Sequence, residues 1–118
     1  MDIRDISDRI EDVSALYAER HGIRRDDDWY VLKLNEEVGE LTQAFLADAG
    51  RARDRGRTPD QLAADLRDEI ADVFAQVLLC ARRFDVDIEQ AVEAKWMPWH
   101  PDRFEQGQAA RSSSSAAR

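Results

Sequence analysis

Two acidic clusters on neighbouring helical segments most restrict how this chain can fold. KLNEEVGEL carries Glu36, Glu37 and Glu40, and RDEIAD carries Glu69 and Asp72. Residues three or four apart share one face of a helix, so each segment presents its carboxylates on one side. Like charges at this spacing repel each other, and a fold that brings the two faces together needs a cation between them. Mg²⁺ and Mn²⁺ prefer oxygen ligands, so the spacing favours a metal site shared by two facing helices.

The spacing of apolar residues predicts an all-α fold of four helices. Side chains such as Leu34, Val38 and Leu41 recur every three or four positions, which is the period of an α-helix. The predicted helices cover residues 3–21, 29–53, 59–84 and 88–96, and the second and third form a long antiparallel pair. Their ends carry matching signals, namely a stop at His21-Gly22 and caps at Asp27 or Asp28, at Thr58-Pro59 and at Asp87.

Residues 1–104 are predicted to form a single domain, because 118 residues is the length of one domain. The tail 105–118 has no large apolar side chain and is expected to be disordered. Phe74 and Leu78 lie away from the main apolar stripe of the third helix, so a second copy of the chain is expected to cover them as a homodimer or homotetramer. Cys80 lies in the apolar run VFAQVLLCA and is expected to be buried.

Charge and hydropathy exclude several classes of partner. The formal charge of −8 argues against a nucleic acid, whose phosphates call for a basic surface. No apolar run reaches the roughly 20 residues that span a bilayer. The charged N-terminus MDIRDISDRI differs from a signal peptide. The chain is therefore expected to be cytoplasmic, with no membrane and no nucleic acid as partner.

Other kinds of catalytic and metal site do not fit these residues. A di-iron bundle uses Glu-x-x-His motifs, and His21 and His100 stand in none. The sequence has no EF-hand loop, no glycine-rich phosphate loop and no Ser or Cys in a recognisable arrangement with a His. Two interpretations of the acidic clusters remain: metal-assisted hydrolysis with water as the nucleophile, or solvated Glu-rich faces without chemistry. The basic run RARDRGR is a solvated helix end and loop, or a set of anion contacts at a site rim or in a neighbouring subunit.

The two clusters together resemble the pattern of a known family. E-E-x-x-E followed by E-x-x-D is similar to the motif of the MazG-like all-α nucleoside triphosphate pyrophosphohydrolases, and the likeness covers roughly residues 29–96. The resemblance implies a four-helix MazG-like bundle that cleaves (deoxy)nucleoside triphosphates between the α and β phosphates, as in nucleotide-pool cleaning. It also implies Mg²⁺, with Mn²⁺ as a substitute, held by Glu36, Glu37, Glu40, Glu69 and Asp72. One of these carboxylates would orient or deprotonate the attacking water.

Four further residues are candidates for binding the substrate. Lys95 matches the family's lysine after the fourth helix and is a candidate phosphate contact. Lys33 is placed to reach a phosphate, and Trp29 either stacks on a base or anchors the core or an interface. The family's usual asparagine and arginine are replaced here by KWMPWHPDRF, in which Arg103 is a base or phosphate contact or part of an arm on a partner subunit.

Two alternative functions stay open at this point. The first is a pyrophosphohydrolase of the same superfamily that acts on phosphoribosyl-ATP. The second is a non-catalytic helical dimerisation or regulatory protein that keeps its acidic faces for solubility.

Overall fold

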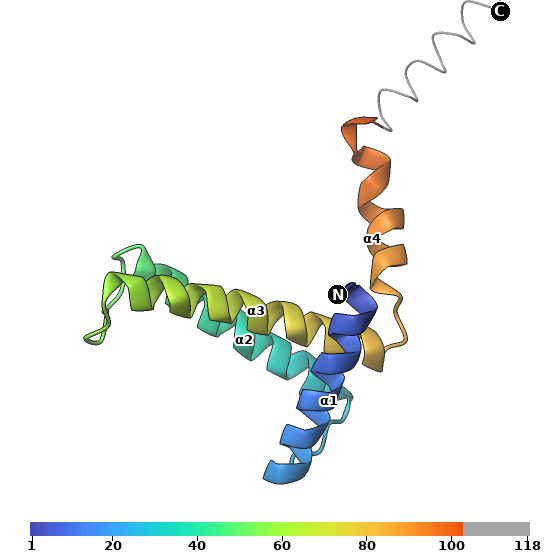
Figure 1. Cartoon of the computed structure of the whole chain (residues 1–118), viewed down its shortest axis with the longest axis horizontal. Coiled ribbons are helices and arrows are strands. Elements are labelled where there is room, and N and C mark those ends of the chain that lie inside the picture. The colour runs from blue at the N-terminus through green and yellow to red at the C-terminus, as the bar shows by residue number, and fades with distance from the viewer. Residues whose placement is uncertain (103–118) are drawn as a thin grey trace, which may run out of the picture. The chain divides into compact units, whose positions relative to one another are not determined.

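The computed structural model describes residues 1–102, and its regular structure in that range is entirely helical (Figure 1). The elements are, in chain order, α1 (Ile3–His21), α2 (Asp27–Asp48), α3 (Pro59–Arg83), α4 (Ile88–Trp96) and a short 3-10 helix, η1 (Met97–Trp99). The prediction of an all-α fold with four main helices is confirmed. None of the helices within residues 1–102 is long and apolar enough to cross a membrane.

The chain divides into two compact units. Helices α1, α2 and α3 lie in the first unit, Met1–Asp85, and α4 and η1 lie in the second, which begins at Val86. Arg103, the predicted domain boundary at residue 104 and the predicted tail lie outside the described residues.

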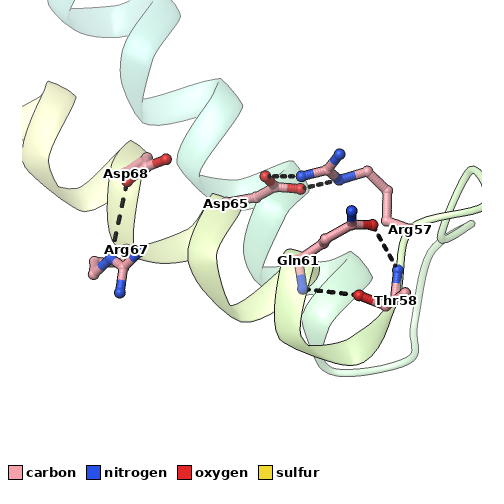
Figure 2. A network of polar contacts seen from close by, with 6 residues as sticks. All are labelled: Arg57, Thr58, Gln61, Asp65, Arg67 and Asp68. Atoms are coloured by element: carbon pink, nitrogen blue, oxygen red, sulfur yellow. Dashed lines mark hydrogen bonds and ion pairs between the residues drawn. The ribbon is translucent and has the colours of Figure 1, made fainter.

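Three helix ends form where the sequence predicts them. Gly22 caps the end of α1, and its left-handed φ of +63° lets the following Ile23 N–H donate to the Ala18 carbonyl at 2.9 Å. α3 begins at Thr58, whose hydroxyl accepts a hydrogen bond from the Gln61 N–H at 3.2 Å, while the Gln61 amide oxygen accepts from the Thr58 N–H at 3.0 Å (Figure 2). Asp87 caps α4 through its carboxylate. Local capping residues therefore set the end of α1 and the starts of α3 and α4.

The start of α2 differs from the prediction by one or two residues. Its N-cap is Asp26, and not Asp27 or Asp28 as predicted. The Asp26 carboxylate accepts a hydrogen bond from the Trp29 N–H at 2.8 Å. The two later aspartates lie in the first turn instead, where negative charge interacts favourably with the helix dipole. With three consecutive aspartates available, only the backbone geometry decides which one caps.

The end of α2 also differs, because the helix stops at Asp48 and does not continue to about residue 53. Gly50 adopts a φ of +73°, its N–H donates to the Ala47 carbonyl at 3.1 Å, and the Arg51 N–H donates to the Leu46 carbonyl at 2.8 Å. This pair of bonds is the Schellman pattern that closes a helix. Residues 51–57 therefore form a loop.

The two long helices lie side by side, and hydrogen bonds between them fix their alignment (Figure 1). The carbonyl oxygen of Tyr30, near the start of α2, accepts from Gln76 Nε2 at 3.1 Å and from Cys80 Sγ at 3.3 Å in the second half of α3. Cys80 is half-buried rather than fully buried, and its thiol is a hydrogen-bond donor. The beginning of α2 therefore faces the later turns of α3.

A small apolar core lies where α1, α2 and α3 meet. The buried apolar side chains of the described residues are Ala18, Tyr30, Leu78 and Leu79. Leu78 is 1% exposed, so the prediction that it leaves apolar surface for a second copy is wrong. It precedes Arg82 by one turn, and Arg82 donates to Asp8 of α1 at 2.7 Å, so Leu78 lies on the side of α3 that α1 covers. Phe74 is 45% exposed, in agreement with the prediction.

Candidate metal centre

Three carboxylates converge between α2 and α3. Glu37 and Glu40 lie one turn apart on α2, and Glu69 lies on α3. One oxygen from each carboxylate lies within 4.8 Å of the others. Neither helix can build this group alone, because the group takes residues from both.

Two oxygens of this group are buried without a hydrogen bond. Glu37 is only 9% exposed. Its Oε2 and the Oε2 of Glu69 are shielded from solvent and have no hydrogen-bond partner within residues 1–102. A buried carboxylate oxygen without a partner is costly. Unpaired oxygens on a shared acidic group fit a hard divalent cation, which takes oxygen ligands and would supply the missing partner.

Burial and mutual repulsion raise the pKa of Glu37 and of Glu69. For Glu37, burial is the largest cause of the raised pKa, and the charge of Glu40 adds to it against the attraction of Lys33. For Glu69, burial again comes first, and the charges of Glu40 and Asp72 follow. The negative charge of the group is therefore unfavourable in the protein alone, and a bound cation would offset that cost.

Asp72 lies beside the three-carboxylate group without joining it. It follows Glu69 by three residues on α3, so it shares that face of the helix. Partial burial raises the pKa of Asp72, and the charge of Glu37 is the next cause. Asp72 therefore lies within electrostatic reach of the group, on the side toward Glu37.

Glu36 points toward Lys33, and the structure does not bring it into the group. Lys33 Nζ lies 3.3 Å from Glu36 Oε1 and 3.4 Å from Glu37 Oε1. The Glu36 side chain is 57% exposed, against 11% for that of Glu37. Burial lowers the pKa of Lys33, but the hydrogen bond and charge of Glu36 and the charge of Glu37 outweigh it and raise the pKa. Lys33 therefore stays protonated and offsets part of the negative charge.

Two pockets border the carboxylates within the first unit. The larger has a volume of about 900 Å³, and its wall includes Glu40, Glu69 and the loop residues Arg53, Arg55 and Arg57. The smaller has a volume of about 600 Å³, and its wall includes Glu37, Asp72, Trp29, Lys33 and Tyr17. The acidic group therefore contributes residues to both pockets, one of which contains the loop arginines and the other aromatic rings.

Some pocket residues were not among the sequence-predicted candidates. Val13 and Tyr17 of α1 line the smaller pocket, and no signal in the sequence shows which face of the helix pair α1 covers. The loop arginines stand out in the sequence as a basic run in an acidic chain, and one of the two interpretations of that run placed them at a site rim. A methyl group added at Gly39 would meet nothing within 4 Å, so the described residues leave space there.

The remaining predicted substrate contacts lie elsewhere in the chain. Lys95 is exposed on α4, in the second compact unit, and Arg103 lies outside the described residues.

Comparison with protein families identifies the domain. The family model of the MazG nucleotide pyrophosphohydrolase domain matches residues 26–104. The chain belongs to this family. The MazG match contains α2, α3 and α4 with all five candidate carboxylates, and it begins after α1. No curated protein and no solved structure matches the chain closely enough to add to this assignment.

Proposed function

We propose that this MazG domain is a Mg²⁺-dependent hydrolase that converts nucleoside triphosphates to nucleoside monophosphates and pyrophosphate. The family is one of nucleotide pyrophosphohydrolases, which supports the reaction class. The observation that carries the proposal is the acidic group itself. Glu37, Glu40 and Glu69 bring three oxygens within 4.8 Å, and two oxygens of the group are buried without a partner.

The proposed metal ligands are Glu37, Glu40 and Glu69, with Asp72 and Glu36 as further candidates from the family motif. Asp72 already lies within electrostatic reach of Glu37. Glu36 would have to turn away from Lys33 to join them. A bound Mg²⁺ or Mn²⁺ would offset the phosphate charge and lower the pKa of a water molecule.

The reaction requires water to attack the α phosphorus. The water oxygen forms a bond to that phosphorus, the bond to the α–β bridging oxygen breaks, and pyrophosphate leaves. The proton of the water passes to one of the carboxylates. Glu37 and Glu69 of the acidic group and Asp72 beside it are the candidate acceptors of this proton.

The smaller pocket is the proposed nucleoside site. Trp29 and Tyr17 offer aromatic surfaces for a base, and Lys33 offers a cation for a phosphate. Lys95 and Arg103 remain proposed phosphate or base contacts from the family pattern and from KWMPWHPDRF. The sugar and base that this pocket accepts determine which nucleotides are substrates.

We also propose that the chain assembles at least as a homodimer. Large apolar side chains on the two long helices remain exposed, including Leu32 at 66% and Ile70 at 53%. Exposed apolar side chains of this size favour burial in an interface. Light scattering coupled to size-exclusion chromatography would measure the mass, and a monomer at micromolar concentration would refute the assembly.

A panel of nucleoside and deoxynucleoside triphosphates and phosphoribosyl-ATP, each with Mg²⁺ or Mn²⁺, tests the function. We expect a monophosphate and pyrophosphate from a triphosphate, and no turnover by Glu37→Gln or Asp72→Asn. Asp12→Asn, which removes an exposed carboxylate of α1, is the matched control and should keep full activity. Diphosphate and phosphate as products would refute the mechanism. Preferential turnover of phosphoribosyl-ATP would show that this compound, and not a nucleoside triphosphate, is the substrate. No turnover of any compound would favour a non-catalytic role.

A further inference from the structure

The loop between α2 and α3 places basic side chains in the same pocket as two carboxylates of the acidic group. Arg53, Arg55 and Arg57 line the larger pocket together with Glu40 and Glu69. The chain has a net charge of −8, so three arginines in the lining of one pocket are an unusual local concentration. The pocket volume of about 900 Å³ is that of a small-molecule site.

Arg57 anchors the loop and is neutralised by its partner. Its Nε and Nη2 donate to the two carboxylate oxygens of Asp65 at 2.7 and 2.6 Å, as Figure 2 shows. Asp65 lies one turn before Glu69 on α3. This paired contact therefore ties the loop to the same helix that carries one of the proposed metal ligands.

The other two arginines keep their charges available. Within residues 1–102, neither Arg53 nor Arg55 forms an ion pair, and both are exposed. A guanidinium presents its N–H donors as a planar fork that matches two phosphate oxygens. An unpaired arginine on a pocket wall is therefore a ready contact for a phosphate group.

Arg55 holds a backbone conformation that a long side chain rarely adopts. Its φ is +53°, that of the following Gly56 is +79°, and the turn is closed by the Arg57 N–H donating to the Asp54 carbonyl at 3.0 Å. Two consecutive positive φ values favour Asn or Gly at the first position. Nothing in the turn itself calls for arginine, and strained positions of this kind cluster at functional sites.

Charge also decides when the pocket can accept an anion. Five carboxylates line it, namely Glu40, Asp54, Asp65, Asp68 and Glu69, against three arginines. A polyphosphate is therefore repelled unless a divalent cation occupies the acidic group. The pocket suits a phosphate ligand that arrives with Mg²⁺.

We propose that Arg53 and Arg55 bind the β and γ phosphates of the substrate, which become the pyrophosphate product. This inference rests on the proposed pyrophosphohydrolase function. It assigns the two pockets to opposite ends of one ligand, with the nucleoside beside Trp29 and the leaving group beside the loop. The α phosphate then lies at the acidic group, which contributes Glu40 and Glu69 to the larger pocket and Glu37 to the smaller one.

Calorimetric titration of the full chain with inorganic pyrophosphate in the presence of Mg²⁺ tests the assignment directly. We expect Arg53→Gln and Arg55→Asn each to weaken pyrophosphate binding about tenfold or more, because a hydrogen-bonded charge contact is lost. Binding of a nucleoside monophosphate should change less than twofold in either variant. The melting temperature of Arg55→Asn should equal or exceed that of wild type, because Asn tolerates the left-handed turn.

Arg51→Gln is the matched control. Arg51 belongs to the same loop and carries the same charge, but its guanidinium lies 5.0 Å from the centre of the Phe45 ring, and it does not line the pocket. The inference is overturned if Arg51→Gln weakens pyrophosphate binding as much as Arg53→Gln, or if both pocket variants bind like wild type. In either case, turnover by the wild-type enzyme would leave the proposed function standing. A wild-type chain that neither turns over a nucleotide nor binds pyrophosphate with Mg²⁺ would overturn both.

Discussion

Replacing Glu37 with glutamine should stabilise the metal-free protein while removing its response to Mg²⁺. Glu37 is 9% exposed, and its Oε2 has no hydrogen-bond partner in the described chain. Glutamine keeps the shape of the side chain, removes the charge, and gives an N–H₂ group that can donate to a neighbouring carboxylate. The exchange therefore relieves repulsion without opening a cavity.

The size of the effect follows from the distances in the group. At an effective dielectric constant of about 20, full charges 4.8 Å apart repel by about 3.5 kcal/mol, and Glu37 has two such neighbours. With the same dielectric constant, the attraction of Glu37 to Lys33 at 3.4 Å stabilises the folded chain by about 5 kcal/mol. Solvent around the exposed Glu40 weakens the repulsion, and sharing of Lys33 with Glu36 weakens the attraction. We expect a net gain of about 1 to 2 kcal/mol in the free energy of unfolding.

Urea denaturation followed by far-UV circular dichroism would measure this gain in EDTA and again in Mg²⁺. In wild type, Mg²⁺ at about 100 times its Kd should stabilise the fold by about 2.7 kcal/mol, and Glu37→Gln should lose most of this. The variant is then the more stable protein in EDTA and the less stable one in Mg²⁺. Glu36→Gln is the control for the measurement in EDTA. That side chain is 57% exposed, so the substitution should change the free energy of unfolding by at most about 0.5 kcal/mol. A destabilised Glu37→Gln in EDTA would refute the argument from repulsion.

Three further predictions follow from burial and charge. In EDTA, the free energy of unfolding should fall as pH rises above the ordinary carboxyl pKa values of 3.8 and 4.5. Glu37, Glu69 and Asp72 have raised pKa values in the folded chain, so the folded chain holds protons that the unfolded chain has released. Thermal melts across pH would show this slope, Mg²⁺ should flatten it, and stability that rises with pH would contradict it. Leu78→Ala should cost about 2 to 5 kcal/mol in urea denaturation, while Phe74→Ala at its exposed position should cost much less; equal costs would place the core elsewhere. Gly39→Ala should raise the free energy of unfolding by about 1 kcal/mol from helix propensity, and a loss instead would indicate that another chain packs against this position.

The elements of the fold could be predicted from local patterns. Apolar spacing gave the helices, and capping residues such as Thr58 gave most of their ends. The early end of α2 was missed because no proline interrupts the chain between Trp29 and Arg53, while the left-handed conformation of Gly50 stops the helix. Leu78 was misplaced because the periodicity of α3 shows where α2 packs and carries no information about α1.

The candidate site was predictable as a motif and less so as an arrangement. Adjacent residues on a helix point about 100° apart, so Glu36 and Glu37 cannot both face α3 in the same way. Only the packing decides that Glu37 turns inward and that Glu36 pairs with Lys33. The side of the pair on which Tyr17 lies is likewise a property of the assembled helices.

The hydrogen bonds to the Tyr30 carbonyl have a consequence for the metal centre. Gln76 donates to this oxygen from one turn beyond Asp72, and Tyr30 itself lies two turns before Glu37. A slip of one residue along a helix shifts a side chain by about 1.5 Å and rotates it by about 100°. A carboxylate displaced in this way would leave the group, so the three carboxylates meet in a single alignment of the helix pair. A substitution at a position that sets this alignment would therefore disperse the group without changing any of its carboxylates.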